Sequence, residues 1–261
     1  MDLLVIGMGR AGGSLARAAT AAGHRLVGVL NRSPVDDYDL LDWNGPFPSA
    51  DLALITVTDA AIPEVASRLA DYWAPATPVV HVSGFTPVAA LEALAAAGAA
   101  TGSFHPLQTL PDPERGAEAL AGAHAAITAT GPLQDLLEQF ALSLGMHPFF
   151  LADEAKPLYH AAAAAASNYV VEALGVAADL LAAAGVDPGV MQPLTRQVVE
   201  NVFAVGADAA LTGPIARGDI GTVAGQVEAA DSVGVGVGRQ FRLLAAATAL
   251  RAGTDIADVL R

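Results

Sequence analysis

The chain of 261 residues has no cysteine and few aromatic or charged residues, at 5% and 15%. The lack of cysteine excludes disulfides, thiolate nucleophiles, iron–sulfur clusters and cysteine-based zinc sites. Its six histidines form no HExxH motif and no close pair, so we expect no metal site and disfavour a zinc hydrolase.

Positive charge is also scarce, with 13 Lys and Arg residues against 27 Asp and Glu and a formal net charge of −14. Such a chain repels phosphate backbones and anionic lipids, so we expect no nucleic-acid partner and no membrane partner. No signal peptide is recognisable, and no run combines the uncharged span and flanks of a membrane helix. We therefore expect a cytoplasmic protein.

The first half of the sequence alternates short apolar runs, typical of strands, with helical patterns, and this alternation predicts an α/β fold with a Rossmann doubly wound, mostly parallel sheet. The expected strands are Leu3–Ile6, Leu26–Leu30, Leu52–Thr56, Val79–Val82, Thr101–Phe104, Ala125–Thr128 and Pro148–Leu151. The expected helices between them are Ala11–Ala22, Ile62–Tyr72, Val88–Ala97 and Leu133–Leu144.

Strand signals stop after Leu151, which predicts an all-α second half. One long alanine-rich helix is expected over Ala155–Ala184, and the glycine-rich run Val233–Gly238 is expected to join two later helices. The other expected helices are Val190–Val205, Val223–Ala230 and Arg239–Arg251. The predicted domains are residues 1–152 and 153–261.

A glycine-rich turn follows the first strand in the pattern G-x-G-x-x-G and opens a helix. The first glycine allows the tight turn, the second lets the backbone approach a pyrophosphate, and the third lets the helix and strand pack closely. A glycine-rich connection without a ligand is the alternative. We favour dinucleotide binding by the residues of this turn, which are Gly7, Met8, Gly9, Arg10, Ala11 and Gly12.

The end of the second strand distinguishes NADP from NAD. An NAD site usually has an acidic residue there, whereas this chain has Asn31, Arg32 and Ser33, which suit a 2′-phosphate. NADP is therefore favoured. Asp36 and Asp37 follow closely and keep NAD open, and a simple turn with a solvated arginine is the structural alternative.

Polar residues after later strands extend the predicted site. Ligands of open parallel sheets lie beyond the carboxyl ends of strands, which favours cofactor contacts for the residues after the third strand. For Asp59, capping of the next helix is an equally good interpretation. Ser83 and His105 are expected where nicotinamide and substrate meet, although a structural role for His105, in a loop before Pro106, is equally supported. The further candidates are Val57, Thr58 and Asp59 for the cofactor and Gln108 for the substrate.

The long helix carries a second polar group. His160 and Asn168 are eight residues apart, about two turns, and can share one face as catalytic residues. A satisfied core pair is the alternative. Lys156, the only lysine, is interpreted as a helix-start residue. Arg217 is a candidate for binding a substrate carboxylate, with a charged turn as the alternative, and Asp219 is expected to cap the next helix.

The segments GMGRAG, HVSG, GSFHPLQTL, YHAAAAAASNY and GPIARGD resemble Rossmann-like oxidoreductases with a C-terminal domain of unknown function. These belong to the 6-phosphogluconate dehydrogenase-like superfamily, beside β-hydroxyacid dehydrogenases, ketopantoate reductases and pyrroline-carboxylate reductases. The resemblance implies an NAD(P)-binding Rossmann domain followed by an all-α, 6-phosphogluconate dehydrogenase C-terminal-like domain for substrate binding and homodimerisation. The β-hydroxyacid dehydrogenases place a catalytic lysine four residues before an asparagine, whereas Ala164 stands there in this chain, so we turn to His160 as the acid–base group.

Together these features predict an NADP-dependent oxidoreductase. Its expected substrate is a small carbonyl, alcohol or imine compound, with or without a carboxylate. The alternative is a non-catalytic dinucleotide-binding or sensor protein.

Overall fold

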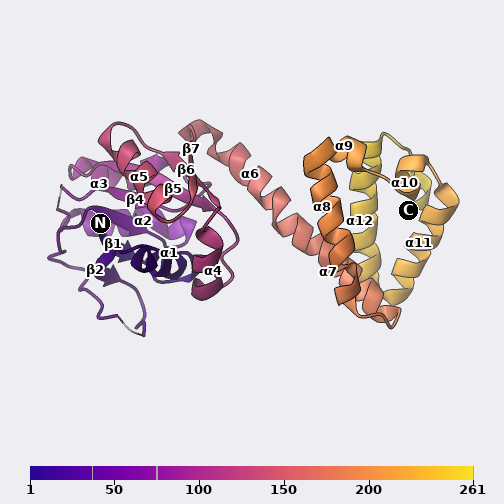
Figure 1. Ribbon diagram of the computed structural model, residues 1–261, viewed down its shortest axis with the longest axis horizontal. Helices are drawn as coiled ribbons and strands as arrows, with labels where there is room; N and C mark the ends of the chain where they lie inside the picture. The colour runs from indigo at the N-terminus through magenta and orange to yellow at the C-terminus, as the bar shows by residue number, and fades with distance from the viewer. Residues whose placement is uncertain (37, 75, 261) are drawn as a thin grey trace. The chain divides into compact units, whose positions relative to one another are not determined.

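The computed structural model describes residues 1–36, 38–74 and 76–260. It divides into two compact units, Met1–Ala164 and Ala165–Arg261, which are described separately (Figure 1). The boundary lies within helix α6 (Lys156–Ala166), because the first turns of this helix pack against the first unit. The functional division predicted at residues 152 and 153 stays a prediction.

The first unit contains a seven-stranded sheet in the order β2-β1-β3-β4-β5-β6-β7, which confirms the predicted α/β fold with its Rossmann-type sheet. The strands from β2 to β5 are parallel, whereas β6 runs antiparallel to β5 and parallel to β7. Because β2 and β3 flank β1, the topological switch point lies at the carboxyl ends of β1 and β3. The strands are β1 (Asp2–Ile6), β2 (Arg25–Leu30), β3 (Leu52–Ile55), β4 (Val79–His81), β5 (Thr101–Leu107), β6 (His124–Thr128) and β7 (His147–Phe150).

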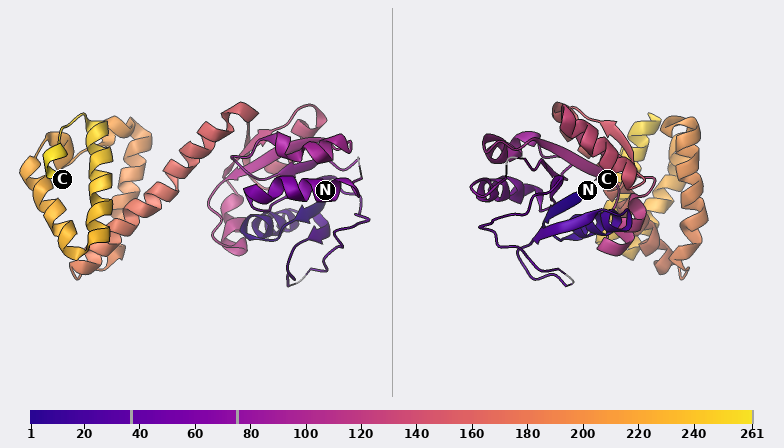
Figure 2. Two further views of the ribbon diagram at one scale, coloured as in Figure 1. Left: turned by 180° about the vertical axis from the view of Figure 1, so that it is seen from behind. Right: turned by 60° about the vertical axis from the view of Figure 1, so that its left-hand side comes forward.

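Helices cover both faces of this sheet (Figures 1 and 2). In β1, Leu3 and Val5 face one core, and Leu4 and Ile6 face the other, as the two-residue period of a strand requires. The first core is covered by α1 (Arg10–Ala21), α4 (Pro113–Leu120) and α5 (Pro132–Ser143), and the second by α2 (Ile62–Ala70) and α3 (Glu92–Ala96). Helix α4 was not expected from the sequence. It is short, has a glycine in its middle and is capped by Asp112.

The second unit is all-helical, as predicted. It contains α7 (Asn168–Ala183), α8 (Gln192–Val205), α9 (Ala207–Ala210), α10 (Pro214–Arg217), α11 (Ile220–Val233) and α12 (Val235–Ala252). One expectation is wrong, and another is only partly confirmed. The long helix is interrupted at Ser167, where φ is −121° and ψ is −75°. The glycine-rich run does join two helices, α11 and α12, but through Gly234 alone, and Gly238 lies inside α12, where it leaves room for Asp231.

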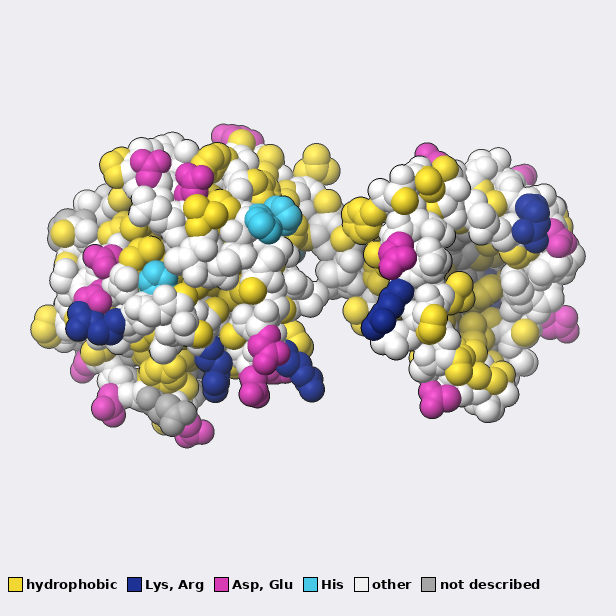
Figure 3. All heavy atoms as spheres, viewed as in Figure 1, with side chains coloured by type: hydrophobic (Ala, Val, Ile, Leu, Met, Phe, Trp, Pro, Cys, Tyr) yellow, Lys and Arg dark blue, Asp and Glu magenta, His cyan; other side chains and the backbone are white. Residues whose placement is uncertain are grey.

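Apolar side chains are poorly covered in the second unit and along α6. Among the described residues, the buried apolar cluster of the second unit is small and consists of Val223, Ala245, Ala249 and Ile256. Figure 3 shows many hydrophobic side chains at the surface of this unit. By length and composition alone, the segment Asp153–Ala183 could span a membrane, because an 18-residue window within it has a mean hydropathy of 1.3 and only 6% of that window is buried. This corrects the expectation that no run qualifies. A helix that packs in a protein interface meets the same two criteria.

Candidate functional site

The glycine-rich turn between β1 and α1 leaves an open space at the start of α1. Gly7 has a φ of +102°, and a Cβ atom at Gly12 would overlap the carbonyl oxygen of Gly7. Gly9 precedes the helix, and a Cβ atom there would meet nothing within 4 Å. Since the first N–H groups of a helix lack partners within it, this space fits the pyrophosphate of a dinucleotide.

Two side chains from neighbouring strands hold the turn in place. Asn31, after β2, accepts a hydrogen bond from the Met8 N–H at 2.9 Å and donates to the carbonyl of Ser33 at 2.8 Å. Thr56, after β3, donates its hydroxyl to the carbonyls of Ile6 and Gly7. Thr56 ends the expected strand Leu52–Thr56, but no role in the site was expected for it.

The side chains that could contact the 2′-substituent of an adenosine follow Asn31 at the end of β2. Arg32, Ser33 and Asp36 are exposed, whereas Asp37 lies outside the described residues. The amide of Asn31 already supports the turn, so Arg32 is the cation at this position that is free to meet a phosphate.

The segment after β3 approaches the loop after β4. Val57 is half-buried, Thr58 is exposed, and the carboxylate of Asp59 accepts a hydrogen bond from Ser83 Oγ at 2.7 Å. The capping interpretation of Asp59 is wrong, because Thr58 occupies the N-cap position. Ser83 is buried, and its Oγ accepts the N–H groups of Phe85 and Thr86, so its hydroxyl organises this loop.

The beginning of α6 anchors the same loop from the other side. Lys156 Nζ donates to the carbonyl of Thr86 at 2.7 Å and lies 3.7 Å from Asp153, whose carboxylate also accepts the Val88 N–H at 3.1 Å. Lys156 is only 1% exposed, and burial lowers its pKa to about 8. This burial supports the interpretation of Lys156 as a residue that fixes the start of the helix.

His105 lies within β5, where it faces Ala126 of β6, rather than in the predicted loop. Strand β4 ends at His81, opposite Ser103, so β5 has only one neighbouring strand beyond that point. Pro106 is tolerated there because it removes no bond to a second strand. His81 is fully buried, its Nδ1 accepts the Ser83 N–H at 3.2 Å, and burial lowers its pKa to about 3, so its ring is neutral near pH 7.

Aromatic and imidazole rings gather around His105. Its Nδ1 lies 2.7 Å from the hydroxyl of Tyr159, and its ring centre lies 6.4 Å from that of His160, which also packs against Phe85 at 5.8 Å. Burial, with His160 and Lys156 nearby, lowers the pKa of His105 to about 4 although Asp59 opposes the shift, and burial raises the pKa of Tyr159 to about 12. Both members of the His105–Tyr159 pair are therefore neutral near pH 7. Tyr159 was not expected in the site from the sequence.

Three further predicted residues, Gln108, Asn168 and Arg217, are exposed. The amide of Gln108 donates to the Ala119 carbonyl at 3.2 Å and accepts the Thr109 N–H at 2.8 Å. Asn168 begins α7, and Arg217 ends α10, both in the second unit, so their part in the site stays a prediction. Asp219 caps α11 by accepting the Thr222 N–H at 3.1 Å, as predicted.

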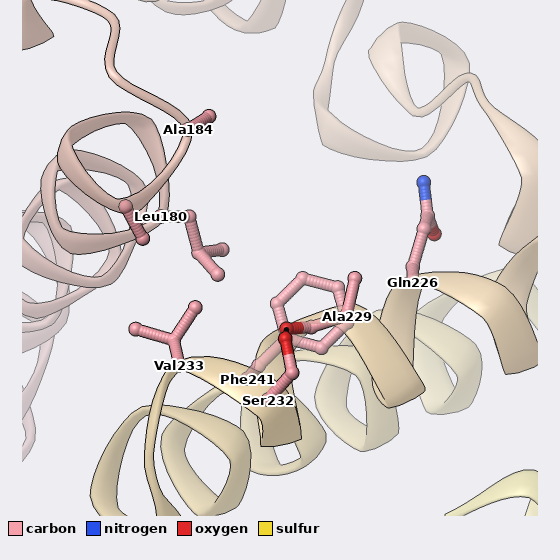
Figure 4. Close-up of a pocket in the computed structure, with 8 residues that line it drawn as sticks. Leu180, Ala184, Gln226, Ala229, Ser232, Val233 and Phe241 are labelled. Atoms are coloured by element: carbon pink, nitrogen blue, oxygen red, sulfur yellow. Dashed lines mark hydrogen bonds between the residues drawn. The ribbon is translucent and has the colours of Figure 1, made fainter.

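The second unit also contains an open hollow of about 730 Å³ between α7, α11 and α12 (Figure 4). Its lining residues are Leu180, Ala183, Ala184, Gln226, Ala229, Ser232, Val233 and Phe241. None of them is charged or titratable, so this hollow supplies no acid–base group. In the described part of the chain, no group of three or more His, Asp or Glu residues could hold a metal ion.

The sheet order, the glycine turn and the helical second unit define a Rossmann-type fold with a helical C-terminal region. The structure described as "putative NADP oxidoreductase BF3122 from Bacteroides fragilis" is 23% identical, with a TM-score of 0.83 over 95% of this chain and 98% of that chain. The imine reductase from Myxococcus stipitatus in complex with NADP+ is 15% identical, with a TM-score of 0.70 over 100% and 98% of the two chains. Pyrroline carboxylate reductase from Plasmodium falciparum with NADP bound is 11% identical, with a TM-score of 0.63 over 97% and 98%.

A more particular relationship comes from the sequence. Residues 123–248 match the family model described as a domain of unknown function, DUF2520. The match begins just before β6 and ends in α12, and it therefore includes the end of the first unit as well as most of the second. No curated protein matches the sequence.

The glycine turn yields a stability prediction. Gly12→Ala should lower the free energy of unfolding by about 3 kcal/mol or more, because overpacking against fixed backbone is costly. Gly9→Ala is the matched control and should change it by less than about 1 kcal/mol, because its Cβ atom enters open space. Urea unfolding followed by circular dichroism measures both variants, and equal losses would contradict the packing argument.

Proposed function

We propose that this protein is an NADP-dependent oxidoreductase that transfers a hydride to or from a small carbonyl, alcohol or imine compound, including compounds that carry a carboxylate. One observation carries the proposal: the open space at Gly9 and the cluster around His105 lie at the carboxyl ends of parallel strands of one sheet. When bound, the cofactor would supply or accept the hydride. The solved structures with NADP named above support this choice through their fold.

The residues of this chain would bind, orient and exchange a proton. The first turn of α1 would hold the pyrophosphate, Arg32 and Ser33 would bind the 2′-phosphate, and Val57, Thr58 and Asp59 would line the nicotinamide side. His160 is exposed beside His105, and it is our proposed proton donor or acceptor. Asn168 would orient the substrate oxygen or nitrogen, with Gln108 and Arg217 as further substrate contacts and Ser83 as the support of Asp59.

A non-catalytic dinucleotide sensor is the second candidate. It is favoured by the hydrogen bonds within the chain that already occupy Ser83 and Gln108. Cofactor turnover with a panel of keto acids, hydroxy acids and imines separates the two functions. Turnover supports the oxidoreductase, whereas saturable cofactor binding without turnover across the panel supports the sensor.

The exposed arginine after β2 predicts a preference for NADPH over NADH. A charge-assisted hydrogen bond contributes roughly 1.5–3 kcal/mol, so Arg32→Ala should weaken NADPH binding about tenfold or more and leave NADH binding nearly unchanged. Arg17→Ala removes the same charge from an exposed position of α1 and serves as the control. Isothermal titration calorimetry measures the affinities, and equal wild-type affinities for the two cofactors would reject the preference.

The proposed role of His160 predicts a kinetic defect without a binding defect. Because removal of a general acid–base group costs about 10²–10⁴ in rate, His160→Gln should lower turnover at least 100-fold while NADPH affinity is retained. His147→Gln, at an exposed position of β7, is the matched control. A His160→Gln variant that keeps its rate but melts at a much lower temperature would show that His160 is structural.

We also propose that the protein is a homodimer formed largely through its helical half. Leu158, Val171 and Phe203 are 79%, 69% and 87% exposed in the single chain, and a second copy would cover such side chains. Static light scattering at micromolar concentration should give twice the monomer mass. A monomer mass, or recovery of the protein only with detergent or lipid vesicles, would reject the dimer, and the second outcome would indicate a membrane contact instead.

A further inference from the structure

The contact between His105 and Tyr159 joins strand β5 to helix α6 within the first unit. The Nδ1–Oη distance is 2.7 Å, and the two rings meet edge to face at 88°. We propose that Tyr159 is a positioning residue that holds His105 as the neutral tautomer with its proton on Nε2. His105 then donates this N–H to a lone pair of the substrate. The role toward substrate rests on the proposed function, whereas the tautomer does not.

The direction of the hydrogen bond follows from the chemistry of the two groups. Phenol is a stronger acid than a neutral imidazole N–H, and an imidazole nitrogen is a stronger base than a phenol oxygen. Tyr159 therefore donates and His105 Nδ1 accepts, and a neutral imidazole that accepts at Nδ1 carries its proton on Nε2.

Burial and the neighbouring groups keep His105 neutral. Burial is the largest cause of its lowered pKa, the nearby His160 and Lys156 add to this shift, and Asp59 opposes it. Tyr159, with its raised pKa, keeps its hydroxyl proton over the same range. From about pH 5 to pH 9 the pair thus has one protonation state.

The surroundings also fix the orientation of the imidazole ring. Gly84 lies against it, and a Cβ atom at that position would come within 2.8 Å of both Cε1 and Nε2. The ring of Phe149 packs against the partner of His105, Tyr159, with the ring centres 6.0 Å apart. Nε2 has no hydrogen-bond partner in the described part of the chain, yet it is not among the fully buried unpaired atoms, so it remains open to a ligand.

The Nε2–H of His105 restricts which substrate groups can bind to it. A ketone, an aldehyde or an unprotonated imine offers a lone pair to Nε2–H, whereas the nitrogen of a protonated iminium ion has no lone pair to accept it. We therefore expect neutral acceptors to be the substrates. In this arrangement His160 exchanges the proton and His105 orients the reacting group.

Nitrogen-15 NMR of the cofactor-free protein tests the tautomer without any assay of activity. His105 should show a protonated Nε2 and an unprotonated Nδ1, unchanged from pH 5 to pH 9. Tyr159→Phe should give a mixture of tautomers. A protonated Nδ1 in the wild type, or titration of His105 near pH 6.5, would overturn the proposal even if the enzyme is active.

Kinetics test the role toward substrate. Tyr159→Phe should lower kcat about 10- to 100-fold with little change in NADPH affinity, since misorientation of a reacting group costs about that much. Tyr72→Phe, at an exposed tyrosine outside the site, is the matched control.

A pair of His105 variants tests the donor itself. His105→Gln keeps an N–H donor and should retain more activity than His105→Leu. Equal activity of these two variants, or an unchanged kcat in a folded Tyr159→Phe variant, would reject the donor role. Absence of any turnover in the wild type would reject the proposed function and leave the NMR result standing.

Discussion

The backbone of α1 at Gly12 lies very close to the backbone of the turn at Gly7, and the arrangement of the carboxyl ends of the strands depends on this contact. Any side chain at this position would overlap the Gly7 carbonyl, and the hydroxyl of Thr56 binds that same carbonyl. The end of β1, the end of β3 and the first turn of α1 are thereby fixed against one another. Asn31 adds the end of β2 through the Met8 N–H. With these neighbours in place, the open side of the turn at Gly9 is set by packing before any ligand arrives.

The buried ammonium group of Lys156 similarly fixes the start of α6 against the loop after β4. Moving Lys156 out of water is costly, and its bond to the Thr86 carbonyl and the nearby Asp153 carboxylate offset that cost. This arrangement fixes the first turn of α6 against the loop after β4. Tyr159 follows three residues later, about one turn, and so reaches His105 on β5. The ring cluster is therefore a product of tertiary packing, because its members come from a strand, a loop and a helix that are distant in sequence.

The sequence was sufficient for the features that depend on local patterns. The seven strands are marked by short apolar runs, the turn by its three spaced glycines, and the cap by an aspartate directly before a helix, so each of these features can be recognised from neighbouring residues alone. Direction and contact are different: a short apolar run does not show that β6 is antiparallel, and an alanine-rich run does not reveal a break at Ser167. His105 seemed to belong to a loop because Pro106 follows it, but β5 lacks a second neighbour there. Tyr159 could have been found only as an aromatic residue beside His160, since its partner lies 54 residues away.

The burial of Lys156 has a consequence for the chemistry of the protein surface. Because the chain has no other lysine, its exposed cationic side chains are all guanidinium groups, and the folded protein presents no side-chain amine to an acylating reagent. Such a reagent can reach Lys156 only when the start of α6 separates from the loop after β4. The rate of amine modification at this one position would then measure how often that contact opens, since local opening exposes groups that the folded state protects. Modification of Lys156 would thus report on the opening of the helix that holds Tyr159 in place.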